Sequence, residues 1–265
     1  VNSLPALLIV DLLLILIAFL VRQSIRKGGL VPKGISGAME MIVEVLYNMT
    51  EGTAGKYAKW IFPWFATIML VVLVANLMKL LPGMETIGVI HHASGEGHTL
   101  QNLGGNWYTV LAETAKEGEG YVLTPFVRAL STDLNFTAAL AIISVVMTQV
   151  IGVRAQGIRY FSKFLNFTTM FKKPFFGFMD FLVGILETIS EIAKILSFAF
   201  RLFGNMFAGF VLLALVGTMV PIFVPSLIFM FEFFIGLIQA FVFGMLTMVF
   251  MAQATQGHGG DEHHE

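Results

Sequence analysis

Five long apolar runs follow one another along the chain, separated by charged or glycine-rich segments. A helix needs roughly 20 apolar residues to cross a hydrocarbon layer of about 30 Å, and the runs approach or exceed that length. The pattern therefore predicts five membrane helices, at residues 4–21, 61–81, 134–153, 175–220 and 222–256. We find no internal repeat of the kind that marks a duplicated transporter. We expect an all-α integral membrane protein whose residues 1–265 form one membrane domain.

A shorter helix is expected at residues 34–50, between the first two membrane helices. Its apolar positions recur at helical spacing while two acids lie on another face, which is typical of a helix lying flat in the membrane interface. The apolar positions are Met39, Ile42, Val43 and Leu46, and the acids are Glu40 and Glu44. The C-terminal residues 257–265 are rich in Gly and His, and we expect them to be disordered.

The composition and the placement of basic residues give the chain an orientation. Hydrophobic residues make up 57% of the chain and charged residues 12%, with a mean hydropathy of +0.82, which is unusual for a soluble domain. Of the 16 Lys and Arg residues, 11 lie in residues 22–59 or in the basic segment 154–173. The positive-inside rule makes these two segments cytoplasmic. The N-terminus and the acidic loop 82–132 are then outside, and the C-terminal tail is inside.

The last two membrane helices are longer than a bilayer requires. Ser226 to Gln256 contains 31 residues and no proline, which is about 46 Å of helix at 1.5 Å per residue. Because the hydrocarbon core is about 30 Å thick, we expect both helices to be steeply tilted and held by a protein surface. They form a hairpin that turns near Pro221.

The fourth membrane helix carries a stripe of polar and charged residues. At 100° per residue, its members fall within about 40° of Glu187 on a helical wheel. They are Glu187, Glu191, Lys194, Arg201 and Asn205, extended by Ser190 and Ser197. A charge in hydrocarbon costs at least about 2.5 kcal/mol, so the stripe must face protein or water. Gly204 and Ala208 beside it are small enough for another helix to approach closely.

A buried structural ion-pair network is the alternative interpretation of this stripe. Glu191 and Lys194 are spaced to pair with one another. Arg201 has no adjacent carboxylate in the stripe, because Glu191 lies about 15 Å away along the axis. Its neutralising partner must therefore come from elsewhere.

The hairpin places polar residues at different depths. Val220 lies midway between Arg201 and Gln239, so these two should face one another. Glu232 shares a face with Gln239 and falls opposite Ala208, nearer the outside than Arg201. Since Glu187 and Glu191 are nearer the inside, a permanently charged arginine separates two sets of carboxylates. This pattern indicates a divided ion path.

Four segments resemble signature segments of subunit a of the F-type ATP synthases. They are RLFGNMFAG at Arg201, LIQAF at Gln239, NLMKLLP at Asn76 and STDLNFTAALAI from Ser131. The resemblance implies that Arg201 is the essential arginine beside a ring of c subunits, with Gln239 as its polar partner. It also implies that Glu232 is the acid of the outer half-channel.

Three positions depart from the family pattern. Ile195 stands where proline is common in the segment that Lys194 and Ser197 match, which leaves the local helix geometry open. Phe210 stands where many relatives carry Glu or His, and Lys79 where Asp is frequent. The charge of the outer vestibule is therefore not settled by the resemblance.

The function implied by the resemblance is that of the stator proton channel, with two offset aqueous half-channels. Protons would enter past Asn76 and Glu232, ride on a ring carboxyl that stays protonated in lipid, and leave past Glu187 and Glu191. The implied path residues are Arg201, Gln239, Glu232, Asn205, Glu187, Glu191, Lys194, Ser197 and Asn76. The implied partners are the c-ring, b-type peripheral stalk subunits, the rest of the enzyme, membrane lipid and protons.

Other functions stay open at this point. The same stripe could bind substrate in a stand-alone secondary transporter or ion channel, and the coupling ion could be sodium, a choice set mainly by the ring. We expect no bond-making chemistry, cofactor, metal or nucleic acid, since phosphate-loop and zinc motifs are absent and the chain has no cysteine. The bacterial plasma membrane is the expected location, with the mitochondrial inner membrane as the alternative.

Overall fold

The computed structural model is dominated by helices. It describes residues 3–27, 35–81, 87–92, 98–104, 107–114, 120–157, 160, 174–219 and 223–256. The α-helices are α1 (Ser3–Lys27), α2 (Ile35–Ala54), α3 (Ala58–Met78), α4 (Leu134–Gln156), α6 (Pro174–Met219) and α7 (Phe223–Thr255). Within the described residues, five helical spans are long and apolar enough to cross a membrane, α2 and α3 counting together as one. The predicted all-α membrane protein is confirmed.

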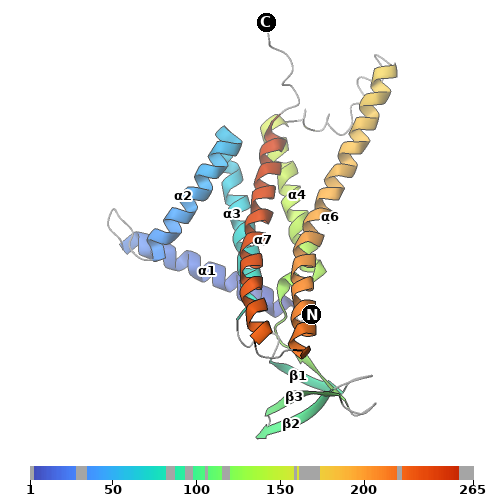
Figure 1. Ribbon diagram of the computed structural model, residues 1–265. Helices are drawn as coiled ribbons and strands as arrows, with labels where there is room; N and C mark the ends of the chain where they lie inside the picture. The colour runs from blue at the N-terminus through green and yellow to red at the C-terminus, as the bar shows by residue number, and fades with distance from the viewer. Residues whose placement is uncertain are drawn as a thin grey trace.

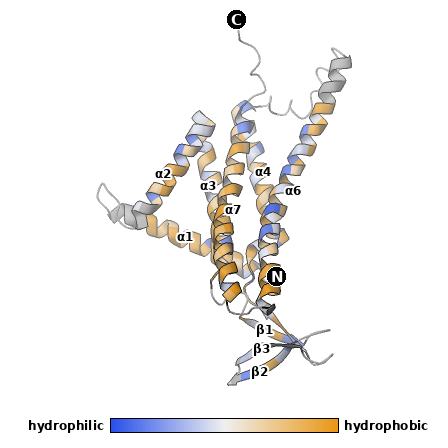
Figure 2. Ribbon diagram, viewed as in Figure 1, coloured by the Kyte–Doolittle hydropathy of each residue, from blue (hydrophilic) through white to orange (hydrophobic). Residues whose placement is uncertain are grey.

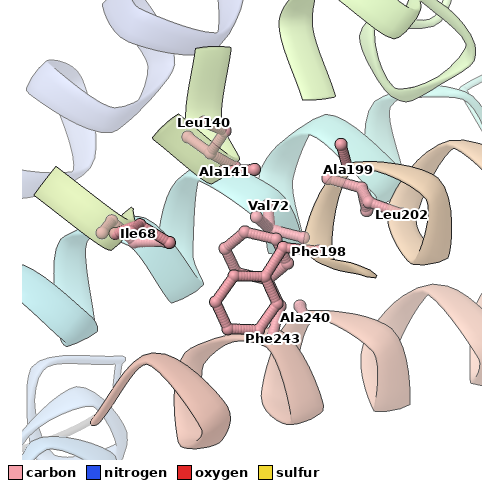
Figure 3. Packing of buried hydrophobic residues seen from close by; sticks show 10 residues of the cluster. Ile68, Val72, Leu140, Ala141, Phe198, Ala199, Leu202, Ala240 and Phe243 are labelled. Carbon is pink, nitrogen blue, oxygen red and sulfur yellow. The ribbon is translucent and has the colours of Figure 1, made fainter. Parts of the chain in front are cut away.

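Four helices share one apolar core. Helix α7 packs against α3, α4 and α6, and these four run side by side in Figure 1. The rings of Phe198 on α6 and Phe243 on α7 lie 4.9 Å apart at the centre of this core (Figure 3). Gly244 allows α7 to approach α3, because a Cβ there would lie only 2.8 Å from Met69 Cβ. The core therefore fixes α7 between α3 and α6.

Helix α6 is by far the longest element. Its 46 residues correspond to about 69 Å, and its N-terminal end extends beyond the other helices in Figure 1. Only 17% of its membrane-span residues are buried inside the chain, against 39% for α7. Figure 2 shows hydrophilic positions interrupting α6 along its length. The steep tilt of α6 and α7 stays a prediction, and the turn near Pro221 lies outside the described residues.

Helices α1 and α2 lie to one side of the core. Helix α1 crosses the foot of the bundle in Figure 1 and packs on α3 through Ala6 and Val10. Helix α2 contains the predicted interfacial helix; it buries Leu46 and leaves Ile42 and Val43 exposed. Its flat position on a membrane stays a prediction. Most of the basic segment 154–173 and the tail 257–265 lie outside the described residues.

The loop 82–132 contains a sheet that the sequence pattern did not predict. Its strands are β1 (Gly88–His92), β2 (His98–Gly104), β3 (Trp107–Thr114) and β4 (Tyr121–Pro125), in the antiparallel order β1-β4-β2-β3. The sheet lies beyond one end of the bundle (Figure 1), which we call the sheet end. The 3-10 turn η2 (Leu130–Thr132) leads from the sheet into α4. His91, His92 and His98 are exposed on the strands, and no metal-binding cluster occurs in the part of the chain that the structure describes.

Candidate functional site

Buried polar residues connect the sheet end of α3 to α7. Asn76, near the C-terminal end of α3, is 2% exposed despite its amide. Its Oδ1 accepts a hydrogen bond from Ser131 Oγ at 2.7 Å, and its Nδ2 donates to the Gly236 carbonyl oxygen at 3.2 Å. Both ends of the amide are therefore satisfied, as burial requires. This fixes Asn76 between η2 and α7.

One turn beyond Asn76, Lys79 forms a buried ion pair with Glu232 of α7. Lys79 Nζ donates to Glu232 Oε1 at 2.9 Å, and the two side chains are 5% and 7% exposed. The second oxygen of the carboxylate, Oε2, is buried and has no hydrogen-bond partner among the described residues. Glu232 is therefore held through one oxygen only.

The carboxylate of Glu232 lies against α6 at Gly209. A Cβ at Gly209 would overlap Glu232 Oε1 and lie 3.2 Å from its Cδ, so the carboxylate occupies the space of the missing side chain. The expected neighbour, Ala208, is the preceding residue and lines the same pocket. This pocket holds about 160 Å³ and is lined by Asn205, Met206, Ala208, Gly209, Leu212, Ile228, Phe231, Glu232 and Ile235.

Gln239 joins α7 to α6 through Asn205. Asn205 Nδ2 donates to Gln239 Oε1 at 2.5 Å, whereas the buried Gln239 Nε2 has no partner among the described residues. Arg201, expected to face Gln239, lies one helical turn from Asn205 and is half-buried. No carboxylate of the described ranges forms an ion pair with Arg201. Its positive charge is therefore not neutralised by this part of the chain.

The remaining stripe residues lie farther from the sheet end. Lys194 Nζ donates to Glu191 Oε1 at 2.8 Å, so the alternative of a structural ion pair holds for these two residues. Lys194 also lies over the ring of Phe250, 4.9 Å from its centroid. Glu187 is half-buried and Ser197 is exposed. The stripe thus contains the ion pair of Glu191 and Lys194 and, nearer the sheet end, Arg201.

Tyr160 was not singled out from the sequence, and it lies near Glu191 and Glu187. Its hydroxyl donates to Gln149 Oε1 at 2.6 Å. Burial, followed by the negative charges of Glu191 and Glu187, raises the pKa of Tyr160 to about 12. Its hydroxyl therefore stays protonated, and available as a donor, at any physiological pH.

Comparison with known sequences decides the family. The sequence model of a family described as ATP synthase A chain matches residues 6–252. This chain belongs to that family. The predicted resemblance to subunit a of ATP synthase is confirmed.

Individual relatives match this chain along most of their length. ATP synthase subunit a 2 of Syntrophotalea carbinolica is 28% identical over 231 residues, covering 87% of this chain and 77% of that protein. ATP synthase subunit a of Moorella thermoacetica is 27% identical over 233 residues, covering 88% and 82%. The subunit a of Mycobacterium bovis is 28% identical over 261 residues, covering 97% and 86%. An ATP synthase subunit a family member with five membrane-capable spans is an integral membrane protein, and its partners are the rest of ATP synthase.

The structure brings several of the predicted path residues together. Asn76, Asn205 and Gln239, taken from the motifs, and Glu232, taken from the hairpin spacing, lie in one connected region. Lys79, which the family comparison left only as a departure, is the direct partner of Glu232. Spacing could have indicated it, because Lys79 follows Asn76 by three residues and shares its helix face.

Proposed function

We propose that this chain is the stationary ion-conducting subunit of ATP synthase and that Arg201 separates two half-paths for protons. The observation that carries the proposal is the position of Arg201. It lies on α6 between the buried acid Glu232, which reaches α6 at Gly209, and the inner carboxylates Glu191 and Glu187. Gly209 is about 12 Å and Glu191 about 15 Å from Arg201 along the helix.

The half-path nearest the sheet end consists of the connected polar groups around Asn76 and Glu232. A proton from the outer side would reach Glu232 and pass across the pocket beside Gly209 to a carboxyl on a c-ring. Of the described residues that line the pocket, Glu232 alone is ionisable. Glu232 is therefore the outer proton carrier in this proposal.

The inner half-path lies on the other side of Arg201. After nearly a full turn of the ring, the proton would leave past Ser197, Lys194, Glu191 and Glu187. A guanidinium does not lose its charge, so it repels a proton that takes the short route and favours ionisation of the ring carboxyl beside it. Each charge that crosses 100 mV carries about 2.3 kcal/mol, which a direct leak would dissipate.

The c-ring would contact the exposed face of α6. Most of the α6 span is unburied within the chain, although it carries charged and amide side chains. Such groups do not face lipid without a large cost. Large apolar side chains beside the stripe are also exposed, among them Leu196, Phe200 and Phe207. A curved ring with one carboxyl per subunit supplies both the apolar contact and the negative charge that Arg201 lacks.

Replacement of Arg201 tests the proposal. In membrane vesicles with the assembled complex, Arg201→Ala should abolish proton-driven ATP synthesis, because the half-paths are then no longer separated. Arg128→Ala, which removes an exposed arginine outside the membrane spans, is the matched control. Co-purification of the ring shows that both complexes assemble. Synthesis by Arg201→Ala at the rate of the control would refute the proposal.

A further inference from the structure

The buried pair of Lys79 and Glu232 links the end of α3 to α7 at the acid of the proposed outer half-path. We infer that Lys79 is the internal counter-ion of Glu232 and a positioning residue for proton transfer. The inference rests on the proposed function, in which Glu232 carries the proton. It goes further by assigning a role to a lysine that stands where the family pattern favours an acid.

The geometry divides the two oxygens of the carboxylate between two tasks. Oε1 is bound to Lys79 Nζ at 2.9 Å and fills the space beside Gly209. Oε2 is buried and has no partner among the described residues. One oxygen therefore fixes the side chain, and in this inference the unpartnered oxygen accepts and releases the proton.

The positive charge of Lys79 also offsets the cost of burying a carboxylate in this place. An isolated carboxylate in apolar surroundings is so costly that it neutralises instead. The described residues that line the pocket include no cation. The amide of Asn76 is already hydrogen-bonded to Ser131 and Gly236 and does not bind the carboxylate. Among the described residues, Lys79 is thus the cation that contacts Glu232.

A purely structural role would be a clamp between α3 and α7. The two roles differ in what they require of the side chain at position 79. A clamp requires assembly and stability, which any well-packed replacement of both partners maintains. A counter-ion requires a positive charge next to Glu232. The test must therefore vary charge separately from packing.

The experiment measures proton-driven ATP synthesis per assembled complex in membrane vesicles. Lys79→Met keeps the length of the side chain, Lys79→Gln keeps a hydrogen-bond donor, and Lys79→Arg keeps the charge. We expect a loss of at least about tenfold for Met and Gln and a change within about threefold for Arg. Lys59→Met, at an exposed lysine, is the matched control and should behave as the unmodified complex.

A double variant separates positioning from stability. Lys79→Met with Glu232→Gln removes both charges, so the complex should assemble as well as the control yet make no ATP. If Lys79→Met or Lys79→Gln makes ATP within twofold of Lys59→Met, the inference is wrong. It is also wrong if synthesis per assembled complex is unchanged and only the amount of complex falls. If the double variant makes ATP while the separate variant Arg201→Ala does not, Glu232 is not the carrier, and the role proposed for Arg201 still stands.

Discussion

Adding a single methyl group at Gly209 is a direct way to displace the carboxylate of Glu232 without changing any charge. In Gly209→Ala the new Cβ would overlap Glu232 Oε1. The oxygen would have to retreat by about 1 Å to reach the roughly 3.5 Å at which such contacts become favourable. That retreat acts directly on the 2.9 Å bond to Lys79 Nζ. A misplacement of about 1 Å in a reacting group can cost on the order of 10²-fold in rate.

The effect on stability should be much smaller than the effect on transport. Overpacking lowers the free energy of unfolding by about 1–3 kcal/mol, while replacing glycine by alanine inside a helix raises it by about 0.5–1 kcal/mol. The free energy of unfolding should therefore fall by no more than about 2.5 kcal/mol. ATP synthesis per assembled complex should fall by between about 10-fold and 100-fold.

Gly217→Ala is the matched control for this variant. It makes the same change on the same helix, where a Cβ would meet only Pro225 Cγ at 4.0 Å. Synthesis should be assayed in vesicles with a fixed proton gradient and normalised to the assembled complex. A rate for Gly209→Ala equal to that of Gly217→Ala would refute the reasoning that the position of this carboxylate controls proton transfer.

Two further predictions concern other parts of α6 and its surroundings. The new methyl group of Gly204→Ala would meet nothing within 4 Å among the described residues. We therefore expect lost ring association, which would locate the ring there, whereas an intact, fully active complex would contradict close approach at this point. Tyr160→Phe should lower the free energy of unfolding by about 1 kcal/mol through loss of the bond to Gln149, measured by thermal denaturation of the purified complex. Because the pKa of Tyr160 is raised from 10.0 to about 12, the unfolded state loses its proton first. The fall in stability as pH rises through this window should therefore be larger in the parent than in the phenylalanine variant; equal pH profiles would contradict the assignment.

The membrane helices could be predicted because each is specified locally. Apolar length alone identifies a span, and the spacing of Glu191 and Lys194 within one helix was enough to expect their ion pair. The depth order of Glu232 and Arg201 on their two helices likewise follows from residue counting. These features need no knowledge of how distant segments pack.

Features that depend on long-range packing were not predicted. Lys79 and Glu232 are 153 residues apart, so their pairing requires α3 and α7 to be placed side by side first. Counting from a symmetric turn sets Arg201 opposite Gln239, which stays a prediction, but it gave no indication of the hydrogen bond between Gln239 and Asn205. The register of two long helices depends on side-chain packing, which residue counting does not contain.

The sheet beyond the end of the bundle was missed for a different reason. Its strands are only five to eight residues long, so no long alternating pattern is available to read. The cross-strand pairing between β1 and β4 decides the structure instead. Tyr160 was missed because it follows the end of α4, outside any periodic segment.

The pairing of β1 with β4 brings the start of the sheet segment next to its end. Gly88 is opposite Pro125, and Phe126 N donates to the Ile87 carbonyl oxygen at 3.0 Å, a few residues before Ser131. This pairing lies just ahead of η2, where Ser131 donates to the amide of Asn76. A label inserted in the sheet away from this pairing should therefore leave the position of that amide unchanged.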